Sequence, residues 1–93
     1  MARAPLELLF SDADYPVSAL QAHQAGTVQV GLEVATDGRV SRCWILKSSG
    51  IAALDLATCR LAKSRSRFTP ATDGSGNPIP AQTTFTRSWR LPD

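Results

Sequence analysis

The clearest pattern of apolar and polar positions in this chain is a strict alternation over residues 27–34. Four apolar side chains point one way while polar or small ones point the other, the apolar set being Val28, Val30, Leu32 and Val34. A period of two predicts a β-strand with one buried and one solvated face, which favours an antiparallel sheet. Asp37-Gly38 is then a hairpin signal, and it predicts a second strand over residues 40–47. The alternation of this second strand is blurred, with Cys43 and Ile45 on one face and Val40, Trp44 and Leu46 mostly on the other.

Two segments have helical character. Residues 52–65 contain neither Gly nor Pro, and five positions form a stripe at helical spacing: Leu54, Thr58, Leu61, Ala62 and Arg65. The preceding Ser48-Ser49-Gly50 breaks the second strand, and its hydroxyls are expected to cap this helix. A shorter helix is predicted over residues 17–24, because Tyr15-Pro16 suits a helix start and Gly26 is placed to end it.

A last strand is predicted over residues 79–91, after a loop at residues 73–78. Arg87 interrupts its apolar side, which predicts a bulge or an edge position; that side contains Thr83, Phe85, Trp89 and Leu91. The order helix, strand, strand, helix, strand predicts an α+β fold: a three-stranded antiparallel sheet with two helices packed on one face. Residues 1–14 are expected to form an extended lead-in, and residues 15–93 the domain.

Composition narrows the functional classes. A chain of 93 residues makes one domain, and 43% hydrophobic with 19% charged residues argues against disorder. The net charge of +2 is too small to indicate nucleic-acid binding. A run of basic residues is typical of a solvated helix face, with a phosphate or membrane surface as the alternative partner; the run is Arg60, Lys63, Arg65 and Arg67. No apolar stretch approaches the roughly 18 residues needed to span a bilayer, and no signal-peptide pattern is present. This predicts a cytoplasmic protein or a piece whose targeting segment lies elsewhere.

The residues that usually carry chemistry are sparse. His23 is the only histidine, and its spacing from Cys43 and Cys59 matches no zinc site. Gly74-Ser75-Gly76 lacks the lysine of a phosphate-binding loop, and no pair of carboxylates stands in a pocket-forming pattern. The sequence therefore predicts a binding module, with no catalytic residues, metal or cofactor.

Cys43 and Cys59 allow two interpretations. A bridge between them would fasten the second strand to the long helix across a loop of about 17 residues, worth roughly 3 kcal/mol in the chain-entropy model. Such a bridge suits a small core in an oxidising compartment. The alternative is a pair of free, buried thiols that pack as small hydrophobes. Periodicity does not separate the two.

Several short pieces, in order, resemble the C-terminal domain of TonB-family energy transducers over nearly the whole chain. They are Tyr15-Pro16 with Ala19, Gly26-Thr27-Val28-Gln29-Val30, Asp37-Gly38-Arg39-Val40, Ser48-Ser49-Gly50, Leu54-Asp55, Arg67-Phe68-Thr69-Pro70-Ala71 and Gly76-Asn77-Pro78-Ile79. Each piece alone is a generic signal, whereas their common order is specific. The cysteine pair resembles a subgroup of these domains with a cysteine at each of the two places, which implies the disulfide.

The resemblance implies a periplasmic domain of a Gram-negative bacterium that serves the transport of siderophores or similar nutrients. Such domains bind the TonB box, an extended peptide of outer-membrane receptors, by adding it as a strand to the sheet edge. The implied peptide contacts lie on the last strand, with lead-in contacts at Asp12 and Asp14; the strand residues are Thr83, Thr84, Phe85, Thr86, Arg87, Ser88, Trp89 and Arg90. The family's membrane helix and proline-rich spacer are not in this sequence.

The alternative function is a structural domain that dimerises through the same edge strand without binding a receptor.

Overall fold

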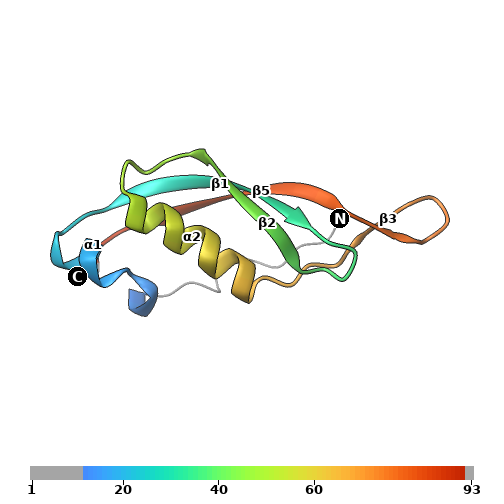
Figure 1. Cartoon of the computed structure of the whole chain (residues 1–93), viewed down its shortest axis with the longest axis horizontal. Coiled ribbons are helices and arrows are strands. Elements are labelled where there is room, and N and C mark those ends of the chain that lie inside the picture. Colours follow the sequence, from blue (N-terminus) through green and yellow to red (C-terminus); the bar gives the residue numbers. More distant parts are fainter. Residues whose placement is uncertain (1–11, 92–93) are drawn as a thin grey trace.

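The computed structural model describes residues 12–91, which form a three-stranded antiparallel sheet with helices on one face (Figure 1). The sheet order is β2-β1-β5, so the first strand is central and the other two are edges. This confirms the predicted fold class. The elements in chain order are η2 (Asp12–Asp14), α1 (Val17–Gln21), β1 (Gly26–Val34), β2 (Val40–Lys47), α2 (Ala52–Arg65), β3 (Ala71–Thr72), β4 (Pro78–Ile79) and β5 (Ala81–Trp89).

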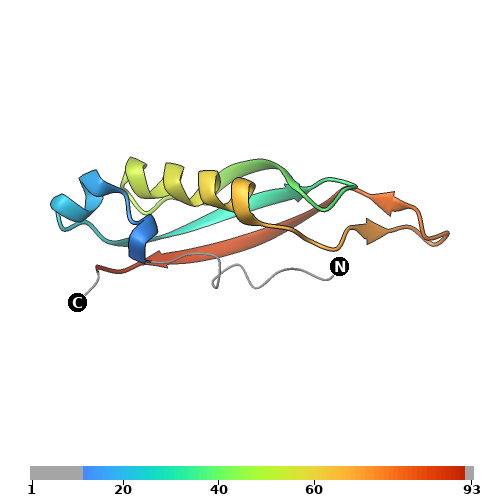
Figure 2. The ribbon, with the colours of Figure 1, turned by 90° about the horizontal axis from the view of Figure 1, so that it is seen from below.

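The core lies between α2 and one face of the sheet. The four apolar side chains of the alternating β1 segment are all 0% exposed, and α2 packs against them with Leu54, Ala57, Leu61 and Ala62. Both helices lie on this same side, as the view along the sheet shows (Figure 2). The period-two pattern of β1 therefore predicted its buried and solvated faces correctly, because the helices pack on only one face of the sheet.

β2 departs from regular pairing at two places. Its register against β1 shifts between Glu33 and Val34 and again between Gln29 and Val30. The first shift leaves Ser41 without an opposite residue, so that Val40 is buried although it stands an odd number of positions from Cys43. The predicted assignment of Val40 to the face opposite Cys43 is therefore wrong, because a bulge reverses the alternation.

The first helix ends earlier than predicted. α1 stops at Gln21, and His23 adopts a φ of 54°, the left-handed conformation that often follows a helix. The N–H groups of His23 and Gln24 bond to the carbonyls of Leu20 and Ala19. The predicted role of Gly26 as the helix end is wrong, since Gly26 already belongs to β1.

A short two-stranded arm, β3 and β4, projects beyond the sheet and extends the longest dimension of the molecule to 51 Å (Figure 2). Its turn is held by Asp73, whose carboxylate accepts the N–H groups of Ser75 and Asn77 at 2.8 and 3.0 Å. These backbone hydrogen bonds keep the pKa of Asp73 below its ordinary value. The predicted loop is present, but the strands that flank it were not predicted.

The N-terminal segment differs from the prediction. Asp12–Asp14 form a single 3-10 turn where the sequence predicted an extended segment. The rest of the predicted lead-in, residues 1–11, lies outside the described residues. Between residues 12 and 91, no helix has the length and apolar composition needed to cross a membrane.

Candidate functional site

The edge formed by β5 is uninterrupted. All nine residues from Ala81 to Trp89 pair with β1 in one continuous register, and no described strand lies on the outer side of β5. Of the two features predicted at Arg87, the edge position is therefore correct and the bulge is not. Every second N–H and C=O of an antiparallel edge strand points away from its partner, so β5 offers a regular row of backbone donors and acceptors.

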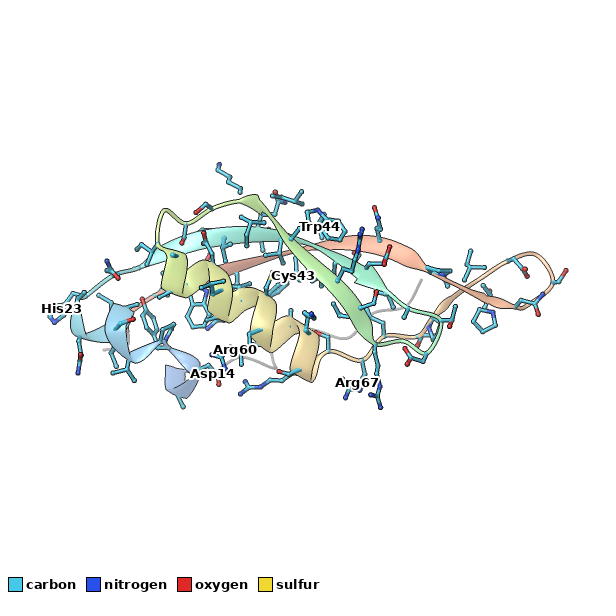
Figure 3. All side chains as sticks on the ribbon, viewed as in Figure 1. Asp14, His23, Cys43, Trp44, Arg60 and Arg67 are labelled. Carbon is cyan, nitrogen blue, oxygen red and sulfur yellow. A yellow bond between two sulfur atoms is a disulfide. The ribbon has the colours of Figure 1, made fainter. Side chains whose placement is uncertain are left out.

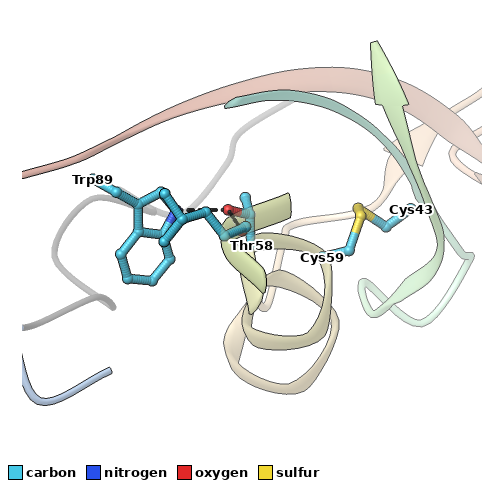
Figure 4. The surroundings of a disulfide bond; sticks show 5 residues. Cys43, Thr58, Cys59 and Trp89 are labelled. Carbon is cyan, nitrogen blue, oxygen red and sulfur yellow. Dashed lines mark hydrogen bonds between the residues drawn. A yellow bond between two sulfur atoms is a disulfide. The ribbon is translucent and has the colours of Figure 1, made fainter. Parts of the chain in front are cut away.

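The opposite edge, formed by β2, is less regular. β2 carries both register shifts, which twist and interrupt its outer row of backbone groups. Cys43 of β2 is also joined to Cys59 of α2, with 2.02 Å between the sulfur atoms and 5.6 Å between the Cα atoms (Figure 4). The pair thus lies at disulfide distance, as the resemblance implied, and it fastens this strand to the helix.

The side chains of β5 divide between the two faces of the sheet. Those on the open face are exposed and hydroxylated: Thr84, Thr86 and Ser88. Those on the helix side are half-buried: Thr83, Phe85 and Arg87. An added strand would therefore meet hydroxyl groups on one face, and an aromatic ring and a guanidinium on the other.

Trp89 anchors the end of this strand. Its side chain is 1% exposed, and its Nε1–H donates to Thr58 Oγ1 over 2.8 Å (Figure 4). Tyr15 packs edge-on against the indole with 5.3 Å between ring centroids, and its buried hydroxyl donates to the Gln24 carbonyl. Burial raises the pKa of Tyr15. The indole of Trp89 therefore belongs to the core, and the predicted peptide contact at this residue stays a prediction.

A surface cavity of about 380 Å³ opens beside the last third of this edge, lined by Thr86, Arg87, Ser88 and Arg90. The guanidinium carbon of Arg87 lies 5.0 Å from the centroid of the Trp89 ring, which holds this cation beside the strand. Arg90 follows the strand and is exposed. Hydroxyl groups and cations together form a site suited to an anionic or strongly polar group.

Asp14, one of the two predicted lead-in contact residues, forms an ion pair within the domain. Both carboxylate oxygens of Asp14 accept from the guanidinium of Arg65, at 2.6 and 2.7 Å, and the Asp14 side chain is only 10% exposed. The same hydrogen bonds raise the pKa of Arg65. Asp14 therefore ties η2 to the end of α2, and the side chain of Asp12 lies outside the described atoms.

The four basic residues of the predicted run do not act as one group. Arg65 is held by Asp14, whereas Arg67 donates to the Ser66 carbonyl beside it. Arg60, labelled in Figure 3, and Lys63 are both on α2 and exposed. The arrangement fits a solvated helix face better than a phosphate site.

The open face of the sheet holds a feature that the sequence pattern did not reveal. Trp44 of β2 stands opposite Gly31 of β1, and a Cβ at Gly31 would come within 2.3 Å of the indole. Arg42 lies 5.5 Å from the centre of the same ring and 3.5 Å from the Glu33 carboxylate. The absence of a side chain at Gly31 therefore leaves the space that the Trp44 indole occupies. Only the strand register, which bulges alter, could have indicated this contact.

The predicted helix cap at Ser48-Ser49-Gly50 is wrong. The residue that precedes α2 is Ile51, and it makes no side-chain cap. The serines instead bind Asp55 in the first turn: Ser48 Oγ, Ser49 Oγ and the Ser49 N–H all donate to its carboxylate. Burial by itself would raise the pKa of Asp55, but these hydrogen bonds outweigh it and hold the pKa low.

The chemistry-bearing residues remain apart. His23 lies at one end of the molecule, far from Cys43 (Figure 3). Over residues 12–91, no three His, Cys, Asp or Glu side chains gather as metal ligands would.

Comparison with known proteins gives consistent results. The sequence profile described as Gram-negative bacterial TonB protein C-terminal matches residues 11–91. Among solved structures, the solution NMR structure of the Pseudomonas aeruginosa TonB C-terminal domain is similar, with a TM-score of 0.65 and 29% sequence identity. That similarity covers 85% of this chain and 78% of the other. No curated protein matches the chain.

Proposed function

Because the chain belongs to the family of Gram-negative bacterial TonB C-terminal domains, we propose that it binds the TonB box of outer-membrane receptors as an added strand along β5. The domain would act in the periplasm, as part of energy-coupled uptake of siderophores or similar nutrients. A segment absent from this sequence would tether it to the inner membrane. Its role is binding without catalysis.

One observation carries the proposal: β5 is the more regular of the two edges of the sheet. Its nine residues keep one register, while β2 is bulged twice and fastened to α2. In strand addition the backbone supplies affinity and the alternating side chains supply selectivity. The hydroxyl groups on the open face suit a polar side of the peptide. The half-buried Phe85 on the helix side suits an apolar one.

The test is an NMR titration of the oxidised protein with a capped peptide that spans a receptor TonB box. We expect backbone amide shifts concentrated on residues 81–90, with much smaller changes along β2. The control is the same peptide with a proline at its centre, which lacks an N–H and cannot pair there. Shifts spread evenly over both edges, or an unresponsive β5 at millimolar peptide, would contradict the proposal.

The same regular edge also favours the alternative, in which β5 of one copy pairs with β5 of another. In that case sedimentation velocity would show a dimer whose population rises with protein concentration. The receptor peptide would then leave the dimer intact. If the peptide dissociates the dimer, the peptide and the second copy compete for the β5 edge. Receptor binding is then retained as the function.

A further inference from the structure

The helices pack on one face of the sheet, so the described helices leave the open face uncovered (Figure 2). Trp44 of β2 lies on this open face with its indole against Gly31 of the central strand. Gly31 is buried and Trp44 only half-buried, so the indole covers the glycine and keeps part of its own surface accessible. A cavity of about 290 Å³ opens beside the ring, lined by Gly31, Trp44, Leu46, Gln82, Thr83 and Thr84.

A second cavity of about 290 Å³ lies on the same face, nearer the start of β1, and is lined by Thr27, Gln29, Lys47 and Thr86. Gln29 and Gly31 are successive open-face residues of β1 and line one cavity each. The two cavities therefore follow one another along the central strand, over about 13 Å from Thr27 to Gly31 at 3.3 Å per residue. Because β1 pairs with β2 on one side and with β5 on the other, a ligand here meets side chains and no free backbone edge.

The side chains around these cavities are mostly uncharged hydroxyls and amides, namely Thr27, Gln29, Gln82, Thr84 and Thr86. Each of them can both donate and accept a hydrogen bond. Among the described lining residues only Lys47 is charged, and the neighbouring Glu33 and Arg42 pair with each other over 3.5 Å. A nucleic acid would need several cations. The face is therefore matched in charge to a neutral ligand that presents donors and acceptors together.

We propose that the open face binds an uncharged, extended oligosaccharide, with one sugar ring stacked on the indole of Trp44. The flat side of a pyranose ring presents C–H groups, which are attracted to the negative face of an aromatic ring. The hydroxyls at its rim then point sideways, toward groups such as Gln82 and Thr84 that donate and accept. A linear chain places its next rings over the second cavity. This site uses side chains of the open face and not the backbone edge of β5, so it is separate from the proposed strand addition.

The probe is cellohexaose, a linear hexamer of glucose with β-1,4 links, added to the 93-residue chain while NMR follows the indole N–H signals of both tryptophans. We expect the Trp44 signal to move and to saturate with a dissociation constant on the order of 1 mM, because the site is shallow. The Trp89 signal should stay in place, since that N–H is buried and bonded to Thr58. Maltohexaose contains the same sugars in α-1,4 links that curve the chain, and it should bind about 5-fold more weakly.

Trp44→Ala should weaken the binding of cellohexaose about 10-fold, followed by the side-chain amide signals of Gln29 and Gln82, whereas Trp44→Phe keeps a ring and should lose about 3-fold. The matched control is Leu56→Ala, which removes an exposed apolar side chain from α2 and should leave the affinity unchanged. The backbone amide spectrum of each variant verifies that it is folded.

A Trp44 signal that does not move at millimolar cellohexaose would overturn the inference. Unchanged binding in Trp44→Ala, an equal loss in Leu56→Ala, or equal affinity for the two hexamers would do the same. None of these outcomes depends on the response of the β5 amides to a receptor peptide, so the proposed function and this inference are tested separately.

Discussion

The two edges of this small sheet are built differently, although the same central strand pairs with both. β5 follows β1 for nine residues without a break, whereas β2 loses register twice within eight. β2 is also joined covalently to α2, while β5 is held by the buried indole of Trp89. Bulges and covering elements are how natural proteins prevent unwanted strand pairing. Among the described strands, one edge is therefore interrupted and covalently fastened, whereas the other is continuous.

The largest effect is expected at the anchor of β5. Trp89→Ala should reduce the free energy of unfolding by about 3–5 kcal/mol, because it removes a buried ring together with its bond to Thr58. Trp44→Ala on β2 removes the same side-chain type from a half-buried site and should cost about 1–2 kcal/mol. Urea unfolding of both variants measures the difference. Equal losses would show that the two strands are anchored alike.

Loss of the disulfide should come next and should act mainly on β2. Replacing both Cys43 and Cys59 by Ala should lower stability by about 3 kcal/mol, since the loop they close is no longer restrained when unfolded. Amide chemical shifts should change along β2 and α2, with β5 nearly unaffected. Comparable shifts on β5 would mean that the disulfide also affects the conformation of that edge strand.

A smaller effect is expected at Gly31, over which the Trp44 indole packs. Gly31→Ala places a methyl group where the indole now lies, and overpacking of this kind costs about 1–3 kcal/mol. The Trp44 fluorescence should shift as the ring moves outward. In the double variant with Trp44→Ala the added methyl group should cost much less. Additive losses would rule out the steric contact as the cause.

The smallest effect concerns Asp55, which binds the serines that follow β2. Its pKa is lowered in the folded state, so its stabilising contribution is complete above the ordinary aspartate pKa of about 3.9. That contribution is lost as the pH falls through the lower, folded-state pKa. Asp55→Asn should therefore cost about 1 kcal/mol near neutral pH and progressively less in acid.

Asp37→Asn is the control for Asp55, since it removes an equal charge from an exposed turn. A loss of stability in Asp55→Asn that does not vary with pH would show that packing, and not the charge of the carboxylate, stabilises the connection between β2 and α2. The measurement is the urea midpoint of each variant from neutral to acidic pH.

The sequence was most informative where one local rule acts alone. β1 was predictable because its apolar residues alternate without interruption. The limits of β2 and α2 followed from the Asp37-Gly38 turn and from a stretch free of Gly and Pro. The edge position of β5 was indicated by Arg87, a charged residue on an otherwise apolar side.

The sequence was less informative where several contacts compete. The bulge at Ser41 arises from the pairing of two strands, and no single strand encodes it. Ser48 and Ser49 were expected to cap the helix backbone, but the Asp55 carboxylate is a stronger acceptor for their hydroxyls. The cavity beside Arg90 depends on how side chains from both faces meet at the edge, which periodicity does not describe.

The unbroken ladder of β5 also has a mechanical consequence. The strand runs along the length of the molecule, and antiparallel hydrogen bonds lie perpendicular to the strands they join (Figure 2). A pull directed along the strand therefore loads these bonds in shear, so that all of them share the tension. A strand interrupted by bulges would yield one section after another. In a TonB-like energy-transduction domain, this geometry lets a short sheet resist a pull that would separate a less regular one.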